Sequence, residues 1–198
     1  MKGYERFLLL SSSPRRREIL KMIGIPFRVY SSFSAMERIY ETPLKTAVEN
    51  AVSKILAGCE KQESEELALA ADTIVVINNQ ILGKPKNREK ARTFLKMLSG
   101  KKHTVITGFA VRLPSGKIIK GYEESGVVFR DLSEGEISWY LNTGEPFDKA
   151  GAYGIQGYGA LLVKRIEGDF FNVMGLPIAK IYDILLDNNI DIKKMVGR

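Results

Sequence analysis

The spacing of hydrophobic and polar residues predicts alternating strands and helices in the first part of the chain. The apolar run at 7–10 is typical of a short buried strand, and Ser13-Pro14 then favours a helix that ends at Gly24. Thr42-Pro43 is a similar helix-start signal and predicts a second helix that ends at Gly58. The run at 67–77 predicts a central strand, which turns at 78–79 into a short return strand at 81–82.

The remaining residues continue this alternation. Asn87 is typical of an N-cap, for a helix that ends at Gly100, and 103–113 and 117–130 predict a hairpin of two longer strands. Ser133 and Glu136 have the spacing of a capping box. Beyond a glycine-rich stretch, 160–166 and 170–173 predict a further hairpin, and Pro177 favours the start of a last helix. The fold class is therefore α/β or mixed α+β.

Composition narrows the class of protein. The 198 residues are 44% hydrophobic and 27% charged, which predicts one globular domain over 1–198 and excludes disorder, collagen and coiled coil. No apolar run approaches the roughly 18–20 residues of a membrane span, and the single cysteine, Cys59, has no disulfide partner, so we expect a cytoplasmic protein. Thirty basic and 23 acidic residues give a net charge of +7, which favours a polyanionic partner.

Hydroxyls and arginines gather at the start of the first predicted helix. The first strand is followed directly by the run Ser11-Ser12-Ser13-Pro14-Arg15-Arg16-Arg17, from which Ser13, Arg15 and Arg16 are the candidate phosphate contacts. A helix N-terminus offers unpaired N–H groups, and cations there oppose the helix dipole unless an anion offsets them. We interpret this run as a phosphate cradle. The alternative is an ordinary helix cap with solvated arginines.

Asp72 and Thr73 interrupt the apolar run at 67–77. A buried, unpaired carboxylate is costly, so we expect Asp72 at a strand end, facing a cleft, a cation or a metal. The alternative is a carboxylate that accepts backbone N–H groups at a bulge. Lys54 on the second predicted helix and Lys84 after the return strand are, taken singly, typical of surface lysines.

The glycine-rich stretch at 144–159 predicts a loop whose backbone turns sharply or approaches a ligand closely. Asp148 and Lys149 are candidate carboxylate and phosphate contacts, and Gln156 offers an amide to a base edge. The alternative is an irregular structural loop with a surface pair between Asp148 and Lys149.

Several familiar chemistries are excluded by the sequence. It has neither a Walker-type phosphate loop nor a dinucleotide-binding glycine motif after a strand. His103 is the single histidine, which argues against a catalytic triad and excludes multi-histidine metal ligation. A hard divalent cation bound by carboxylates and substrate phosphates remains compatible with the chain.

Taken together, these segments resemble the Maf family of nucleoside triphosphate pyrophosphatases over nearly the whole chain. The matching motifs are Ser13-Pro14-Arg15-Arg16, Ala71-Asp72-Thr73, Gly83-Lys84-Pro85, the glycine-rich stretch from Gly144-Glu145-Pro146 to Gly154-Ile155-Gln156-Gly157, and Gly175-Leu176-Pro177. The resemblance implies a two-lobed α/β fold similar to inosine triphosphatases, with a mixed sheet, flanking helices and a central cleft. It also implies a divalent metal, Mg²⁺ or Mn²⁺, and cleavage of a nucleoside triphosphate to a monophosphate and pyrophosphate.

The resemblance also assigns roles to individual residues. Asp72 matches the family's proton acceptor, Lys54 and Lys84 match its catalytic lysines, and Arg15 would share the phosphate site. Arg16, Thr73 and Gln156 match the positions that set substrate specificity. An acidic residue expected after the second strand is assigned to Glu37, which with Asp72 would hold the metal. The family's usual pair of acids is broken here by Met36.

Gln156 matches the subgroup that prefers dTTP and UTP, so this activity is the expected function, with modified pyrimidine nucleotides as further candidate substrates. The family also implies roles in excluding modified nucleotides and in division arrest. A basic nucleic-acid-binding or division-regulating protein without catalysis is one alternative, and a slow nucleotide sensor is another. We expect no membrane and no stable nucleic-acid partner, and a homodimer is compatible with the sequence.

Overall fold

The computed structural model describes residues 6–31, 35–59 and 67–196. The chain forms two compact units, each made from several stretches of sequence. The first unit consists of 1–72, 107–123 and 175–198, and the second of 73–106 and 124–174. Three long strands contribute residues to both units, so the two units share strands rather than being joined by a linker.

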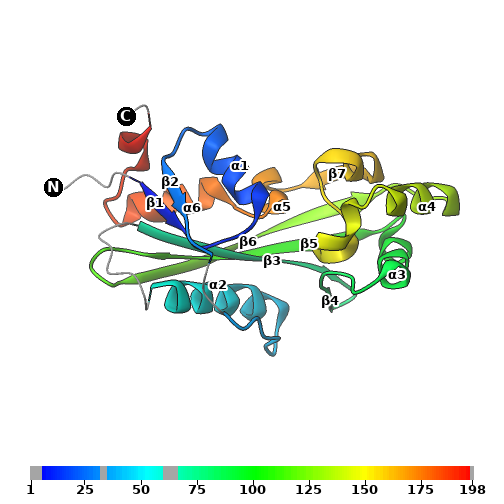
Figure 1. The fold of residues 1–198 in the computed structure, drawn as a ribbon, viewed down its shortest axis with the longest axis horizontal. Coiled ribbons are helices and arrows are strands. Elements are labelled where there is room, and N and C mark those ends of the chain that lie inside the picture. Colours follow the sequence, from blue (N-terminus) through cyan, green and yellow to red (C-terminus); the bar gives the residue numbers. More distant parts are fainter. Residues whose placement is uncertain (1–5, 32–34, 60–66, 197–198) are drawn as a thin grey trace. The chain divides into compact units, whose positions relative to one another are not determined.

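Among the described residues, seven strands form one mixed sheet in the order β2-β1-β3-β5-β6-β7, with β4 paired to β3 (Figure 1). β1 runs parallel to both β2 and β3, whereas β4 is antiparallel to β3 and β7 is antiparallel to β6. The strands are β1 (Phe7–Leu9), β2 (Phe27–Val29), β3 (Leu67–Ile77), β4 (Gln80–Leu82), β5 (Lys102–Arg112), β6 (Ile118–Phe129) and β7 (Val163–Glu167). The predicted mixture of helices and strands is confirmed as an α/β fold.

In the first unit, helices cover both faces of the sheet. α2 (Pro43–Cys59) lies on one face, and α1 (Pro14–Met22) and α6 (Ile178–Asp187) lie on the other (Figure 1). α2 packs closely because Gly108 of β5 has no side chain: a Cβ there would lie 2.3 Å from the backbone of Ala47. Small and branched residues fill the contact, among them Leu8, Ala51, Ile55, Ala68 and Ala110. This packing places the α2 face against the middle of β3.

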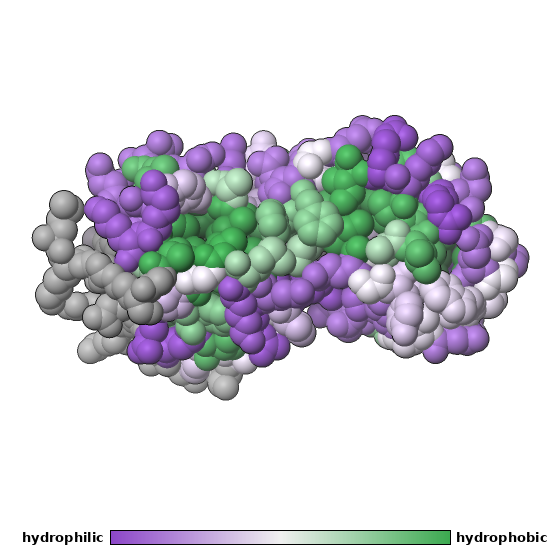
Figure 2. Space-filling model, turned by 90° about the horizontal axis from the view of Figure 1, so that it is seen from above, coloured by the Kyte–Doolittle hydropathy of each residue, from purple (hydrophilic) through white to green (hydrophobic). Residues whose placement is uncertain are grey.

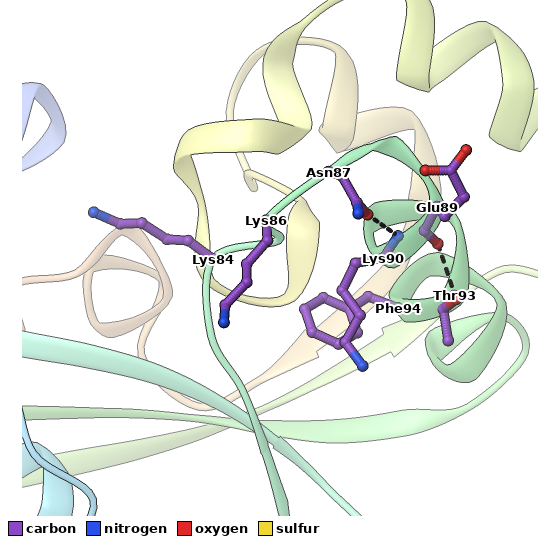
Figure 3. A pocket seen from close by; sticks show the side chains of 7 residues that line it. All are labelled: Lys84, Lys86, Asn87, Glu89, Lys90, Thr93 and Phe94. Atoms are coloured by element: carbon purple, nitrogen blue, oxygen red, sulfur yellow. Dashed lines mark hydrogen bonds between the residues drawn. The ribbon is translucent and has the colours of Figure 1, made fainter.

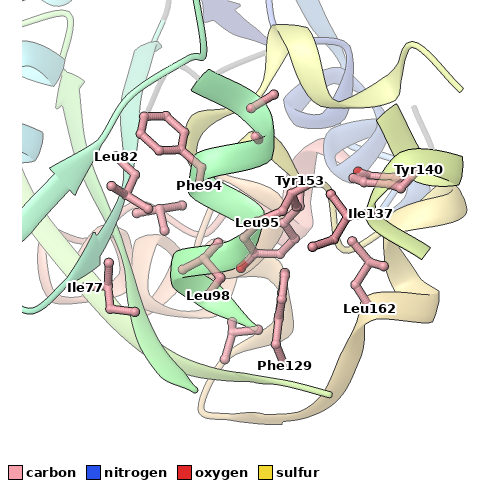
Figure 4. Close-up of a cluster of buried hydrophobic side chains, with 14 of the residues drawn as sticks. Ile77, Leu82, Phe94, Leu95, Leu98, Phe129, Ile137, Tyr140, Tyr153 and Leu162 are labelled. Atoms are coloured by element: carbon pink, nitrogen blue, oxygen red, sulfur yellow. The ribbon is translucent and has the colours of Figure 1, made fainter. Parts of the chain in front are cut away.

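The second unit has a separate hydrophobic core (Figure 4). α3 (Arg88–Leu98) and α4 (Glu134–Asn142) pack Phe94, Leu95, Leu98 and Ile137 against the ends of β3 and β6. Asn87 caps α3 by accepting a hydrogen bond from Lys90 N, and α4 begins with the predicted capping box. α5 (Phe170–Met174) completes the unit.

The predicted hairpin at 160–166 and 170–173 is wrong. Residues 157–162 form a 3-10 helix, β7 pairs with β6 instead, and 170–174 are helical. Asp169 starts that helix, since its carboxylate accepts a hydrogen bond from Phe171 N and its carbonyl accepts one from Val173 N. The aromatic and β-branched residues of this segment favour a strand, and the local capping outweighs that preference.

The described helices include none that is long and apolar enough to cross a membrane. On the face drawn in Figure 2, hydrophobic residues form patches that are bordered by hydrophilic residues. Trp139 and Tyr158 of the second unit are both partly exposed and contact each other edge to face at 5.8 Å between ring centroids.

Candidate functional site

Two carboxylates converge on one ammonium group in the first unit. Lys54 Nζ lies 2.6 Å from Asp72 Oδ1 and 2.9 Å from Glu37 Oε1. The Lys54 and Asp72 side chains are 14% and 10% exposed, whereas Glu37 is 61% exposed. Lys54 also donates to the Ala71 carbonyl at 3.5 Å. The structure thus brings together three of the residues selected from the sequence, and it does so on the face of β3 covered by α2.

Asn50 is a member of this cluster that the sequence reasoning missed. It lies one turn before Lys54 on α2 and is 4% exposed. Its Nδ2 donates to Asp72 Oδ2 at 3.1 Å and to the Arg38 carbonyl at 3.1 Å, and its Oδ1 accepts from Arg38 N at 2.9 Å. Asn50 therefore connects Asp72 to the segment that carries Glu37. The sequence signal that could have identified Asn50 is a polar residue on the apolar face of a predicted helix.

Two expectations about this cluster are corrected. Asp72 lies in the middle of β3, not at a strand end, and its carboxylate accepts hydrogen bonds from the side chains of Asn50 and Lys54 rather than from backbone groups at a bulge. Burial is tolerated there because an ammonium and an amide offset the charge. Lys54 is likewise a buried, paired lysine and not a surface one. Thr73 follows on β3, and since side chains alternate along a strand, it faces away from α2.

Arg16 is the buried cation of the predicted phosphate cradle. Its Nε donates to the Gly175 carbonyl at 2.8 Å and its Nη1 donates to Ser11 Oγ at 2.9 Å. Burial lowers the pKa of Arg16 to about 10, against the opposing attraction of Asp72, so it stays charged at neutral pH. Ser11 belongs to the candidate run at 11–17 but was not selected as a site residue, and Gly175, the other anchor of Arg16, belongs to the motif Gly175-Leu176-Pro177.

Ser13 and Pro14 begin α1 as expected, although the Ser13 side chain makes no capping hydrogen bond. Ser13 N instead donates to Ser11 Oγ at 3.2 Å. Arg15 is half-buried in the first turn, which contains no acidic residue. The N-terminus of α1 thus carries arginines and no acidic residue in its first turn, an arrangement that suits an anion.

Lys84 lies in the second unit, between β4 and α3, and its side chain is exposed. Lys84 borders a pocket of about 540 Å³. Figure 3 shows that the Lys84 side chain points away from the side chains of Lys86 and Lys90. The pocket is lined by Lys84, Lys86, Asn87, Glu89, Lys90, Thr93 and Phe94.

The glycine-rich stretch is an irregular loop with three short 3-10 helices: η1 (Glu145–Asp148), η2 (Ala150–Ala152) and η3 (Gly157–Leu162). The surface pair foreseen as the alternative for this loop is present, with Lys149 Nζ 2.6 Å from Asp148 Oδ1. Lys149 is nonetheless only 13% exposed, and its ammonium also donates to the Glu145 carbonyl at 2.7 Å. Gln156 is half-buried and extended, immediately before η3.

A match to a protein-family model now decides the family. The model, described as Maf-like protein, covers residues 6–188 of this chain. The chain belongs to the Maf-like family. The resemblance inferred from the motifs is thereby confirmed over nearly the whole sequence.

The Maf-like chain has similar curated relatives in bacteria and archaea. A dTTP/UTP pyrophosphatase of Caldanaerobacter subterraneus subsp. tengcongensis is 46% identical over 184 residues, which are 92% of this chain and 89% of that protein. One of Pyrococcus furiosus is 47% identical, over 91% of this chain and 94% of that protein. One of Alkaliphilus oremlandii is 47% identical, over 95% and 98%.

Solved structures of more distant proteins also align with the Maf-like chain. The Staphylococcus aureus Ham1 protein is 14% identical with a TM-score of 0.49, and covers 78% of this chain and 77% of that one. A nucleoside-triphosphatase / dITP/XTP pyrophosphatase from Mycobacterium abscessus is 12% identical with a TM-score of 0.44, and covers 97% and 98%.

The carboxylates of the Maf-like site are few for a divalent metal ion. Among the described residues, no group of three or more His, Cys, Asp or Glu side chains is placed to hold a metal ion. Two carboxylates do converge on one cation, the ammonium of Lys54. This donor set fits Mg²⁺ or Mn²⁺, since such ions are commonly held by one or two carboxylates together with waters and substrate phosphates.

Proposed function

We propose that the chain is a nucleoside triphosphate pyrophosphatase that hydrolyses dTTP and UTP to the monophosphate and pyrophosphate. The observation that carries this proposal is the convergence of Asp72 and Glu37 on the Lys54 ammonium, with the buried cation Arg16 in the same unit. The curated relatives named dTTP/UTP pyrophosphatase support the reaction and the substrates. A reaction on a tetraanionic substrate also accounts for the net charge of +7.

The proposed reaction is a displacement at the α-phosphorus. A water oxygen forms a bond to this phosphorus, its proton passes to Asp72, and the bond from the α-phosphorus to the bridging oxygen breaks so that pyrophosphate leaves. Asp72 acts as the base, and the Lys54 ammonium and the Asn50 amide orient its carboxylate by donating hydrogen bonds to it.

The cationic side chains stabilise the charge that develops on the leaving group. Arg16 is suited to this because its guanidinium is oriented by two hydrogen bonds before substrate arrives. We assign Ser13, Arg15, Lys84 and Lys149 to phosphate binding, with Asp148 as the partner that orients Lys149. Lys54 positions Asp72 and Glu37 relative to each other and adds positive charge.

Asp72 and Glu37 are the residues that would hold Mg²⁺ or Mn²⁺. The ion would supply charge neutralisation and polarisation of the phosphate oxygens. Its binding requires Lys54 to share or give up its present contacts with the two carboxylates, which is compatible with the long, flexible lysine side chain.

Gln156 and Thr73 are proposed to set specificity. A glutamine amide has one acceptor and two donors, so its oxygen suits N3–H of thymine or uracil while its nitrogen donates to O4. Cytosine presents the opposite pattern. Discrimination therefore requires that the Gln156 amide be held in one orientation.

The decisive test is pyrophosphate release from a panel of nucleoside triphosphates, with and without Mg²⁺. We expect fastest release from dTTP and UTP. Binding without release would favour a nucleotide sensor. Tight binding of nucleic acid without release would favour a basic binding protein that lacks catalysis. Release of pyrophosphate from modified pyrimidine nucleotides would extend the function to the removal of damaged precursors. A link to division arrest would follow from that role.

A further inference from the structure

Glu145 is the acceptor around which the segment bearing Gln156 is folded. Its Oε1 accepts hydrogen bonds from Tyr140 Oη at 2.8 Å and from Gly159 N at 3.0 Å. Its Oε2 accepts one from Tyr158 N at 2.9 Å. Both backbone donors follow Gln156 closely in the sequence, so one carboxylate holds the residues on the C-terminal side of the recognition amide.

Tyr140 holds the other side of the same segment. Its hydroxyl is the acceptor for Gly154 N at 3.2 Å, and it donates its proton to Glu145. The side chain is fully buried in α4, and burial is the main cause that raises the pKa of Tyr140, with the Glu145 hydrogen bond adding to it. The hydroxyl is therefore neutral at physiological pH, and its donor and acceptor roles are fixed.

The glycines of the segment allow the backbone to approach these two side chains. Gly157 has φ +66°, and a Cβ on it would lie 2.6 Å from Glu145 Oε2. A Cβ on Gly159 would lie 2.1 Å from the Gly154 carbonyl oxygen and 2.8 Å from Tyr140 Oη. The backbone thus closes around the pair of side chains with no room for other residues at these positions.

The start of the loop is tied to the same residue. Glu145 N donates to Thr143 Oγ1 at 3.2 Å, and the Glu145 carbonyl accepts from Lys149 Nζ at 2.7 Å. Glu145 therefore uses its backbone to order η1 and its side chain to order 154–159. These contacts all lie inside the second unit.

We propose that Glu145, acting with Tyr140, is a positioning residue for base recognition: it holds 154–159 in one conformation and thereby fixes the orientation of the Gln156 amide. This inference rests on the proposed reading of the base by Gln156. A Gln156 amide on a loosely held segment would present either edge, and would accept cytosine as well as thymine or uracil. Discrimination would fall even though every phosphate contact remained.

Glu145→Gln is the sharpest test because it keeps the shape of the side chain. The amide oxygen of the glutamine can still accept two hydrogen bonds. Its NH₂ group, however, faces a backbone N–H, so this N–H loses its acceptor and meets another donor. Tyr140→Phe removes the hydroxyl and leaves Gly154 N without its acceptor. The matched control is Glu136→Gln, a carboxylate of the same unit that accepts hydrogen bonds from Ser133 and Arg130 in the capping box of α4.

We expect Glu145→Gln and Tyr140→Phe to lower the ratio of kcat/KM for dTTP to that for CTP at least ~10-fold, mainly through a higher KM for dTTP, because ground-state binding of the base is what is lost. Glu136→Gln is expected to lower the melting temperature and leave this ratio unchanged. A ratio unchanged in Glu145→Gln, or lowered equally in Glu136→Gln, would overturn the proposal.

Amide hydrogen exchange of the unliganded protein provides a readout that needs no turnover. Exchange at Gly154, Tyr158 and Gly159 is expected to accelerate in Glu145→Gln and to stay slow in Glu136→Gln. Unchanged protection at all three amides would overturn the positioning role. A wild-type protein without preference among bases would instead refute recognition by Gln156, while the exchange data would still decide whether Glu145 holds the segment.

Discussion

The ammonium of Lys54 lies 2.6 Å from the carboxylate of Asp72, and the two side chains are only 14% and 10% exposed. A charge pair this well removed from water depends on both partners, since the loss of either leaves an uncompensated buried charge at a cost of roughly 3–5 kcal/mol. The same pair places a carboxylate beside a positive charge, and the proposed hydrolysis uses both groups.

Asp72→Asn is expected to reduce kcat for dTTP at least ~100-fold, the loss typical of a general base, because the amide cannot accept the proton. The measurement is steady-state pyrophosphate release, with circular dichroism as the check on folding. Glu41→Gln is the control, since Glu41 belongs to an exposed ion pair with Lys45. Near-normal turnover in Asp72→Asn would transfer the role of base to Glu37.

Asn50→Ala is expected to lower both stability and activity. It removes three hydrogen bonds that connect Asp72 to the Arg38 backbone, so we expect a loss of about 1–3 kcal/mol in the free energy of unfolding. Activity should fall roughly 10-fold, as for residues that orient a functional carboxylate. Denaturant unfolding and kcat measure the two effects. Asn188→Ala is the control, at the C-cap of α6. Wild-type activity in Asn50→Ala would contradict the positioning of Glu37 through Asn50.

Gln156→Glu is expected to abolish the preference for dTTP and UTP. A carboxylate has acceptors only, so it opposes O4 of these bases, whereas it can accept from the N1–H and N2–H₂ edge of guanine. The change in kcat/KM should reach about 100-fold for dTTP, because unpaired polar groups in a base-reading site are costly. An unchanged nucleotide profile would remove Gln156 from the recognition site.

Removal of divalent metal is expected to abolish hydrolysis. Treatment with a chelator followed by desalting should leave a folded, inactive protein, and added Mg²⁺ or Mn²⁺ should restore pyrophosphate release. A melting temperature measured in parallel separates loss of the ion from loss of the fold. Full activity in the metal-free protein would refute the assignment of Asp72 and Glu37 as metal ligands.

Stability is expected to fall as the pH drops below about 6.5, because of His103. Its ring is buried on β5 with Nε2 2.7 Å from Tyr153 Oη, and burial lowers the pKa of His103 to about 4. Between pH 6.5 and 4 the unfolded chain therefore binds a proton that the folded one does not. The contribution of His103 to the free energy of unfolding is fully present above pH 6.5, and the free energy of unfolding should fall by roughly 2 kcal/mol by pH 5.

Denaturant unfolding of the wild type and of His103→Gln at pH 7.5 and pH 5 checks this expectation. The variant is less stable at both pH values but should lose the pH-dependent difference, since glutamine does not titrate in this range. Equal pH dependence in the two proteins would show that other groups cause the effect.

Local sequence signals determined most of the helices and strands. Pro14, the Asn87 cap and the capping box of Ser133 and Glu136 act within a few residues, so their positions follow from the sequence alone. Local patterns likewise identified Asp72 and Gln156 as candidates, because a carboxylate in an apolar run and an amide among glycines are unusual wherever they occur. Lys54 became a candidate only through the resemblance to the Maf family. The segment at 170–174 was mispredicted because its aromatic and β-branched residues favour a strand, whereas capping by Asp169 decides its structure.

The tertiary structure alone decided which partners these residues have. Asn50 and Asp72 are 22 positions apart, and the sequence contains no signal for their hydrogen bond, which exists because α2 packs close over a sheet with a glycine at 108. The same holds for Arg16 and the carbonyl of Gly175, which are 159 positions apart. Contacts between distant segments depend on how helices pack on the sheet, and a periodic pattern specifies which face is buried but not what it meets.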